Sequence, residues 1–207
     1  MAYTFTRKTD NVDKIMAVDV NELQAAIEDI STDVDTMSNI NATFLLSAAG
    51  ITPAATNGCA DPEKKTTSSN LINYKVAAFD KDAIEIGWWN HPLPSDYNGG
   101  TITFRVFWEH PATTTNFKVA WDLAAVAIDD DGAIDTAVGT AIQVNDEGGT
   151  TNDLYRTATS SALTIAGTPA AGKMVYWRLR RVANDGTNDT LAVDAWLQYV
   201  EITYTRA

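Results

Sequence analysis

The sequence predicts a mainly β protein, an antiparallel jelly-roll-like β-sandwich preceded by an N-terminal coiled-coil helix. Two periodicities predict it. Between residues 20 and 44 the apolar residues step by three and four, which is the period of a helix that packs against its own copies. From residue 71 onwards, apolar residues alternate with polar ones in short runs separated by turn residues, as in half-buried strands. No helical pattern lies between these runs, so a parallel sheet with crossover helices is not expected.

The chain divides into four predicted parts. Its first residues are polar and mildly basic and resemble an arm rather than a folded element. After the heptads, a stretch without periodicity contains Gly50, Pro53 and Gly58, which exclude a long helix and predict a linker. The predicted parts are an attachment arm at residues 1–18, a coiled-coil oligomerisation helix at 19–44, a linker at 45–70 and a β-sandwich head at 71–207.

The predicted helix begins at Asp19, which can cap the free backbone N–H groups, and Glu22 three residues later completes a capping box. An isolated helix of this length is marginal in water, so the helix is expected inside an oligomer. Its two alternating core positions predict the oligomerisation residues Val20, Leu23, Ile27, Ile30, Val34, Met37, Asn41 and Phe44.

The apolar seam also bears on the number of chains. No Lys or Arg lies between Val20 and Phe44, so salt bridges between helices cannot select the partner and the shape of the core must do so. Ile at both core positions favours trimers, and Ile27 and Ile30 form such a pair. We therefore predict a homotrimer. The alternative is an ordinary amphipathic helix that packs on its own domain.

The predicted strands follow from runs of period two. Alternation places Trp88, Trp108, Trp121 and Trp177 on the apolar face of their strands, where they are expected in the core. A change of parity near Ala195 predicts a bulge or corner in the last strand. The eight predicted strands cover residues 71–79, 82–90, 100–110, 115–128, 136–145, 153–166, 173–183 and 190–206.

Four side chains are predicted to face away from the core and are candidates for a ligand or subunit contact. Trp89 lies on the face opposite Trp88, and Phe107 also faces away from its strand's core, so each is a sugar platform or an interface residue. Arg178 and Arg180 share an outward face in the only basic cluster. They are expected to form ion pairs across strands or with a neighbouring chain, and an anionic-ligand site is the alternative.

Composition excludes several kinds of partner. The 207 residues include 27 acidic and 15 basic side chains, giving a net charge of -12, so neither nucleic acid nor an anionic membrane surface is an expected partner. The single cysteine, Cys59, cannot form an intrachain disulfide. The first residues contain no apolar segment of a signal peptide, so a standard secreted precursor is not expected.

No pattern of residues predicts catalysis, a cofactor or a resident metal. The two histidines, His91 and His110, lack a nearby nucleophile in a recognisable motif and lack metal-ligand spacing. The acidic run from Asp129 to Asp131 has its glycine in the wrong place for an EF-hand loop, so a solvated turn is expected, and a weak calcium site stays open. We therefore expect a protein that is not an enzyme.

The segment Ala17-Val-Asp-Val-Asn-Glu-Leu-Gln-Ala-Ala-Ile-Glu-Asp-Ile30 resembles the start of tailed-bacteriophage virion proteins. In that family a short arm leads into similar heptads, and a β-rich domain follows. The resemblance implies a virion location, attachment to other virion proteins through the N-terminal arm, trimerisation through the coil and a β head that faces outwards. It does not distinguish a tail fibre, a head spike and a capsid decoration protein.

The sequence therefore predicts a homotrimeric structural protein of a bacteriophage particle. The alternative is a receptor-binding or glycan-binding head protein of a phage fibre, with a host-surface glycan as its partner. A depolymerase-like enzyme is a third candidate, which the lack of β-helix repeats disfavours.

Overall fold

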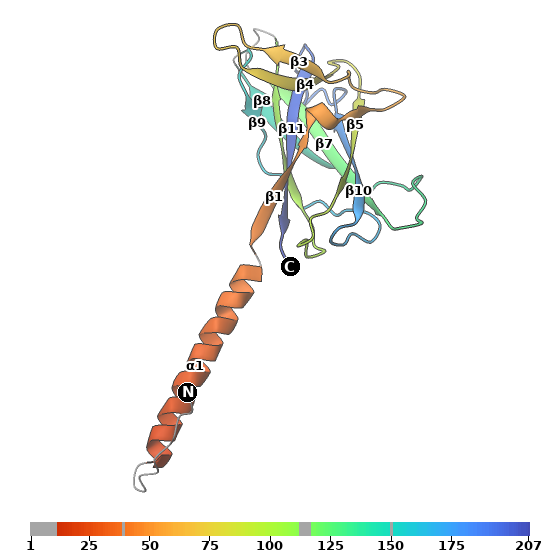
Figure 1. Cartoon of the computed structure of the whole chain (residues 1–207). Coiled ribbons are helices and arrows are strands. Elements are labelled where there is room, and N and C mark those ends of the chain that lie inside the picture. Colours follow the sequence, from red (N-terminus) through yellow and green to blue (C-terminus); the bar gives the residue numbers. More distant parts are fainter. Residues whose placement is uncertain (1–11, 39, 112–116, 150) are drawn as a thin grey trace. The chain divides into compact units, whose positions relative to one another are not determined.

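The computed structural model describes residues 12–38, 40–111, 117–149 and 151–207, and side chains are not described at 12–18 and 33–38. The chain forms two compact units, Met1–Ile40 and Asn41–Ala207. The first unit contains a helix and the second a β-sandwich (Figure 1). The predicted arm at residues 1–18 lies largely outside the described residues.

Helix α1 spans Val12–Ser38, so both predicted ends of the coiled-coil helix are wrong. Asp19 is an interior residue of α1 and not its cap. Met16 and Val12 continue the four-residue steps backwards from Val20, and nothing in this stretch stops a helix, since it holds neither Gly nor Pro. In the described part of the chain, no helix is long and apolar enough to cross a membrane.

The segment that follows α1 is a strand, β1, at Asn41–Ser47. Asn41 and Phe44 were predicted as core positions of the coiled coil, and that prediction is wrong. β1 pairs along its whole length with the last strand of the chain, from Asn41 opposite Thr205 to Ser47 opposite Tyr199. Phe44 fits the heptad only by coincidence. Partly buried Phe44 and buried Leu46 alternate with exposed residues, which is the two-residue period of a strand.

The β-strands form two antiparallel sheets, which confirms the predicted sandwich. The first sheet is ordered β3 (Glu63–Thr66), β4 (Asn73–Phe79), β11 (Ala195–Thr205), β6 (Thr103–Glu109) and β9 (Tyr155–Arg156), with β1 also on β11. The second is ordered β2 (Thr52–Pro53), β5 (Glu85–Pro92), β10 (Met174–Arg181), β7 (Phe117–Ile128) and β8 (Ile142–Gly148).

The predicted linker at residues 45–70 is part of the sandwich. It contains the end of β1, a 3₁₀ turn at Ala48–Gly50, β2 and β3. Ile51 and Cys59 are buried in the core, and the backbone of this segment bonds to β5 through the N–H and carbonyl groups of Ile86. The segment lacks periodicity because it crosses from one sheet to the other and is not a single long strand.

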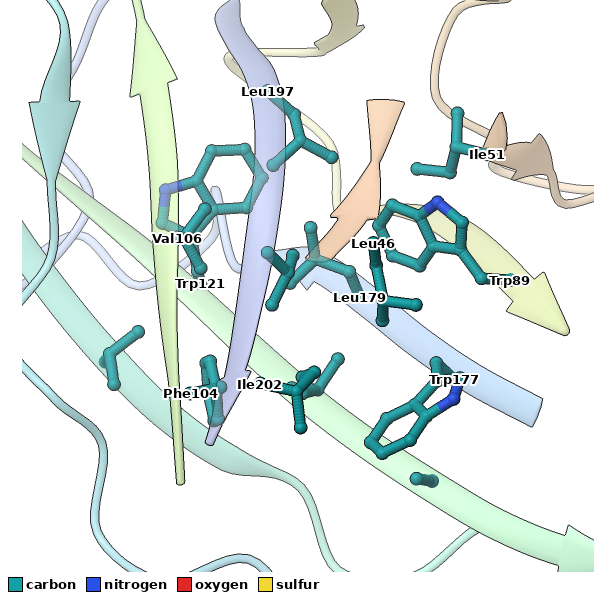
Figure 2. Close-up of a cluster of buried hydrophobic side chains, with 14 of the residues drawn as sticks. Leu46, Ile51, Trp89, Phe104, Val106, Trp121, Trp177, Leu179, Leu197 and Ile202 are labelled. Carbon is teal, nitrogen blue, oxygen red and sulfur yellow. The ribbon is translucent and has the colours of Figure 1, made fainter. Parts of the chain in front are cut away.

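The space between the sheets is filled by large side chains from both (Figure 2). Trp108, Trp121 and Trp177 are fully buried, as the alternation of their strands predicts. The parity change in the last strand is confirmed as an irregularity between Leu197 and Tyr199, slightly later than expected.

One ion pair lies inside this core. Arg181 and Asp189 have side chains that are 0% and 1% exposed, with 2.8 Å between Nη2 and Oδ1. Arg181 also donates to the backbone carbonyls of Phe79, Val193 and Leu191. The guanidinium group is therefore satisfied on every side, which is the condition under which a buried charge is tolerated.

Candidate functional site

The apolar seam of α1 is exposed wherever its side chains are described. Val20 and Ile27 are each 57% exposed, and Leu23 and Ile30 are each 62% exposed. Val34 and Met37 lie on the helix, but their side chains are outside the described residues. A seam of large apolar side chains on a helix is typical of a surface that is covered by another helix.

Trp89, the predicted outward tryptophan, is a core residue. Its side chain is 4% exposed, lies near Leu46 and Ile51 in Figure 2, and donates from Nε1 to the carbonyl oxygen of Ser47 at 2.8 Å. It can be neither a sugar platform nor a surface contact. Residues 87 and 89 of β5 both point into the core. The prediction failed because residue 87 is a glycine, whose side-chain space is filled by Ile51, so the alternation did not show which face is buried.

Trp88 accordingly points outward, and its predicted place in the core is wrong. It is partly exposed on the outer face of the second sheet, directly opposite Arg178 on β10. The next outward pair along the same two strands is Asn90 and Tyr176. We call these four residues, Trp88, Asn90, Tyr176 and Arg178, the β5–β10 surface.

The neighbouring strand β7 contributes small side chains beside this surface. Ala124 lies opposite Arg178, and Val126 lies opposite Tyr176. Both point outward, yet they are almost fully buried, at 0% and 2% exposure. A ligand on this face would therefore not contact Ala124 or Val126 directly. A shallow depression lined by residues 128–130 and 170–174 lies at the end of β7 and the start of β10.

The two predicted outward arginines differ in their partners. Arg180 forms an ion pair with Asp122, in which Nε donates to Oδ1 at 2.9 Å, as ion pairing across strands predicts. In the described part of the chain, the Arg178 side chain has neither a hydrogen bond nor an ion pair, and its Nε is buried. Burial, followed by the positive charge of Arg180, lowers the pKa of Arg178.

Phe107 lies on the outer face of the first sheet, as predicted, and its ring is in contact with neighbouring side chains of that face. Its ring packs edge-on against Tyr199 with centroids 5.4 Å apart, and the Arg156 guanidinium lies 5.9 Å from its centroid. Farther along this face, the Lys65 ammonium lies 3.9 Å from the ring centroid of Trp196. Lys65 and Arg156 on this face therefore have aromatic partners.

Three further side chains of chemical interest, Asp129, His91 and Cys59, have structural environments. Asp129, in the acidic turn, pairs with Lys173 at 2.5 Å, and the described residues contain no group of three His, Cys, Asp or Glu placed to hold a metal ion. His91 stacks on Phe44, with centroids 4.8 Å apart. Burial raises the pKa of the Cys59 thiol to about 12, so it is not a thiolate nucleophile at neutral pH.

Comparison with known proteins finds no matching family model and no matching curated sequence. Solved structures with a similar sandwich include a family 35 carbohydrate binding module from Clostridium thermocellum, at 10% identity and a TM-score of 0.41, covering 78% of this chain and 97% of that one. A CBM22-2 xylan-binding domain from Paenibacillus barcinonensis has 10% identity and a TM-score of 0.44, covering 78% and 99%. At these identities the similarity concerns architecture and not ligands.

Proposed function

We propose that this protein is a homotrimeric appendage protein of a bacteriophage particle, in which α1 joins three chains and the β-sandwich heads bind a glycan. The protein acts by assembly and binding and not by catalysis. The virion setting, with attachment to other virion proteins through the N-terminal arm, is supported by the resemblance of residues 17–30 to phage virion proteins.

The trimer is supported by the seam of α1. Val20, Leu23, Ile27 and Ile30 are all more than half exposed in the single chain. Covering an aliphatic side chain of this size is worth about 1.5–3 kcal/mol. The same residues in two further copies would cover this seam, and Ile at both core positions favours three strands.

Glycan binding is supported by the β5–β10 surface, and this observation carries the proposed function. Trp88 and Tyr176 present partly exposed aromatic rings, and Asn90 adds an exposed side-chain amide. A sugar offers an apolar face to an aromatic ring and hydroxyl groups to an amide, so these residue types match it. A purely structural appendage, such as a capsid decoration protein, has no need of this surface. We therefore favour the receptor-binding appendage over the purely structural one.

Three heads on one helix bundle would also make weak binding effective. Sites on linked modules bind with an avidity that can exceed the single-site affinity by about 10²–10⁴ when all can reach the same surface. Trimerisation and glycan binding are thus parts of one function.

Glycan binding is tested with the full chain on an array of bacterial surface glycans. We expect retention by at least one glycan, and a loss of at least tenfold in Trp88→Ala. The matched control is Trp196→Ala, which removes a tryptophan from the outer face of the other sheet and should leave retention unchanged. No retention by any glycan, or equal loss in both variants, would contradict glycan binding at this surface.

Assembly is tested separately by the mass of the full chain in solution. Analytical ultracentrifugation should give three copies in one particle. A monomer at micromolar concentration would overturn the trimer. Immunogold labelling of purified phage particles then tests the virion setting, and particles without label would contradict it.

A further inference from the structure

We propose that the ligand of the β5–β10 surface is an acidic glycan, in which a sugar carboxylate binds Arg178 and the ring of that sugar lies on Trp88. This inference rests on the proposed glycan binding and adds the chemical class of the sugar, a uronic or sialic acid. It follows from the unusual state of Arg178 and not from the fold.

In the part of the chain that the structure describes, Arg178 has no carboxylate partner, although acidic side chains are abundant. Acidic side chains outnumber basic ones by 27 to 15. Four other described arginines, Arg105, Arg180, Arg181 and Arg206, lie within salt-bridge distance of a carboxylate. Arg156 has no carboxylate partner among the described residues, but it is exposed and its guanidinium group lies 5.9 Å from the ring centroid of Phe107. The Asp122 carboxylate, whose charge raises the pKa of Arg178 by less than burial lowers it, is held by Arg180. Among the described residues, the partly buried Arg178 guanidinium group thus has no carboxylate partner, and it lies beside two partly exposed aromatic side chains.

The unpaired state has a cost that a ligand could recover in part by pairing with the terminal Nη groups of Arg178, since Nε itself is buried. The Nε of Arg178 is buried without an acceptor among the described residues. A buried donor left unsatisfied costs about 1–3 kcal/mol, and more when the group is charged. A carboxylate fits the planar guanidinium group with two parallel hydrogen bonds, so it is the anion that this group recognises best.

The register of the strands brings the arginine and the aromatic ring to one sugar. Arg178 and Trp88 are directly opposite each other on neighbouring strands, which places their Cβ atoms about 4.5–5.5 Å apart. A pyranose ring on Trp88 can therefore direct a carboxylate at Arg178. Asn90 and Tyr176, the next pair, are placed for hydroxyl groups of the same or the next sugar. Ala124, on the other side of Arg178, contributes no competing polar group.

The inference is tested by calorimetric titration of the full chain with acidic polysaccharide fragments and their carboxyl-reduced forms. The probes are polygalacturonate, alginate, hyaluronan and polysialic acid. We expect at least one acid form to bind at least tenfold more tightly than its reduced partner. Arg178→Gln should abolish that preference while leaving the weaker binding of the reduced form. Arg178→Lys, which keeps the charge but not the two parallel hydrogen bonds, should restore part of it.

Two controls separate the possible failures. Arg156→Gln removes an arginine from the outer face of the first sheet and should leave the preference intact. If the acid and reduced forms bind equally, and Trp88→Ala removes both, the acidic ligand is wrong while glycan binding stands. If no probe or array glycan binds, both are wrong. If Arg178→Gln instead changes the mass of the assembly, Arg178 pairs with a neighbouring chain and the inference fails.

Discussion

The two units of this chain treat their large apolar side chains in opposite ways. In the β unit, Trp108, Trp121 and Trp177 are fully buried by the chain's own two sheets. In α1, Ile27 and Ile30 are 57% and 62% exposed. The β unit therefore completes its core within one chain, whereas the described part of the helix has large apolar side chains that are exposed, which we propose other chains cover. This contrast predicts that the two units respond to different mutations.

The largest expected effect is on assembly. Ile27→Asp places a carboxylate in the predicted core of the trimer, and leaving a buried charge without a partner costs about 3–5 kcal/mol. Three chains incur this cost at once, so the trimer should dissociate, as measured by ultracentrifugation, and Ile30→Asp should do the same. The head should keep its strand signal in circular dichroism.

The matched control is Gln24→Asp, which adds the same charge on the polar flank of α1 and should leave the trimer intact. Loss of strand signal in Ile27→Asp would show that the two units do not fold separately.

The second prediction concerns the buried ion pair of the head. Asp189→Ala removes the carboxylate that accepts hydrogen bonds from Nε and Nη2 of Arg181 and from the backbone N–H of Ala120. An uncompensated buried guanidinium group should lower the free energy of unfolding by about 3–5 kcal/mol. Urea denaturation measures this, with the exposed Asp130→Ala expected within about 0.5 kcal/mol of the unmodified protein.

The third prediction separates the two adjacent tryptophans of β5. Trp89→Ala leaves a cavity in the core and frees the carbonyl of Ser47, so the head should lose about 3–5 kcal/mol in its free energy of unfolding. Trp88→Ala, on the outer face, should cost about 1 kcal/mol or less. The same urea series measures both variants, and similar losses would mean that Trp88 is a structural residue and not part of a binding surface.

The smallest effect is a pH dependence. Glu109 is 2% exposed and accepts hydrogen bonds from Tyr74 at 3.1 Å and Gln198 at 3.4 Å. Burial raises its pKa, and the two hydrogen bonds lower it by less. The folded head therefore holds a proton to higher pH than the unfolded chain does. Between those two pKa values, the contribution of Glu109 to stability falls as pH rises.

Glu109→Gln removes this titration. Its free energy of unfolding, relative to that of the unmodified protein, should therefore rise between pH 4 and pH 7. Urea denaturation across this range measures the difference. A difference that stays constant with pH would refute the assignment to Glu109.

Much of the β unit could be predicted from alternation. The predicted strands at residues 71–79, 115–128 and 173–183 overlap β4, β7 and β10 closely. These strands have one buried face, so their side chains carry the period. β1, β2 and β3 were missed because two of them are short and the third continues the spacing of the heptad. The predicted end of α1 was too late because Asn41 and Phe44 of β1 continue the heptad spacing.

The candidate site was predicted only in part. Alternation on β10 correctly placed Arg178 and Arg180 outward, since Trp177 and Leu179 fill the inner positions. On β5 the inward position before Trp89 is Gly87, which has no side chain to mark the buried face. Trp88 was therefore assigned to the core and Trp89 to the surface, the reverse of the structure. Among the described residues Arg178 has no carboxylate partner because Arg180 holds Asp122, and no local pattern in the sequence encodes that pairing.

The sequence by itself determined the class of the fold, the apolar seam of the helix and the outward position of the arginines, because each follows from spacing within one element. Tertiary structure alone decided the pairing of β1 with β11, the place of residues 45–70 in the sandwich and the outward turn of Trp88. These features arise where segments far apart in the chain compete for one space, as Ile51 does at Gly87. Such competition has no period along the chain, so only the folded molecule shows its outcome.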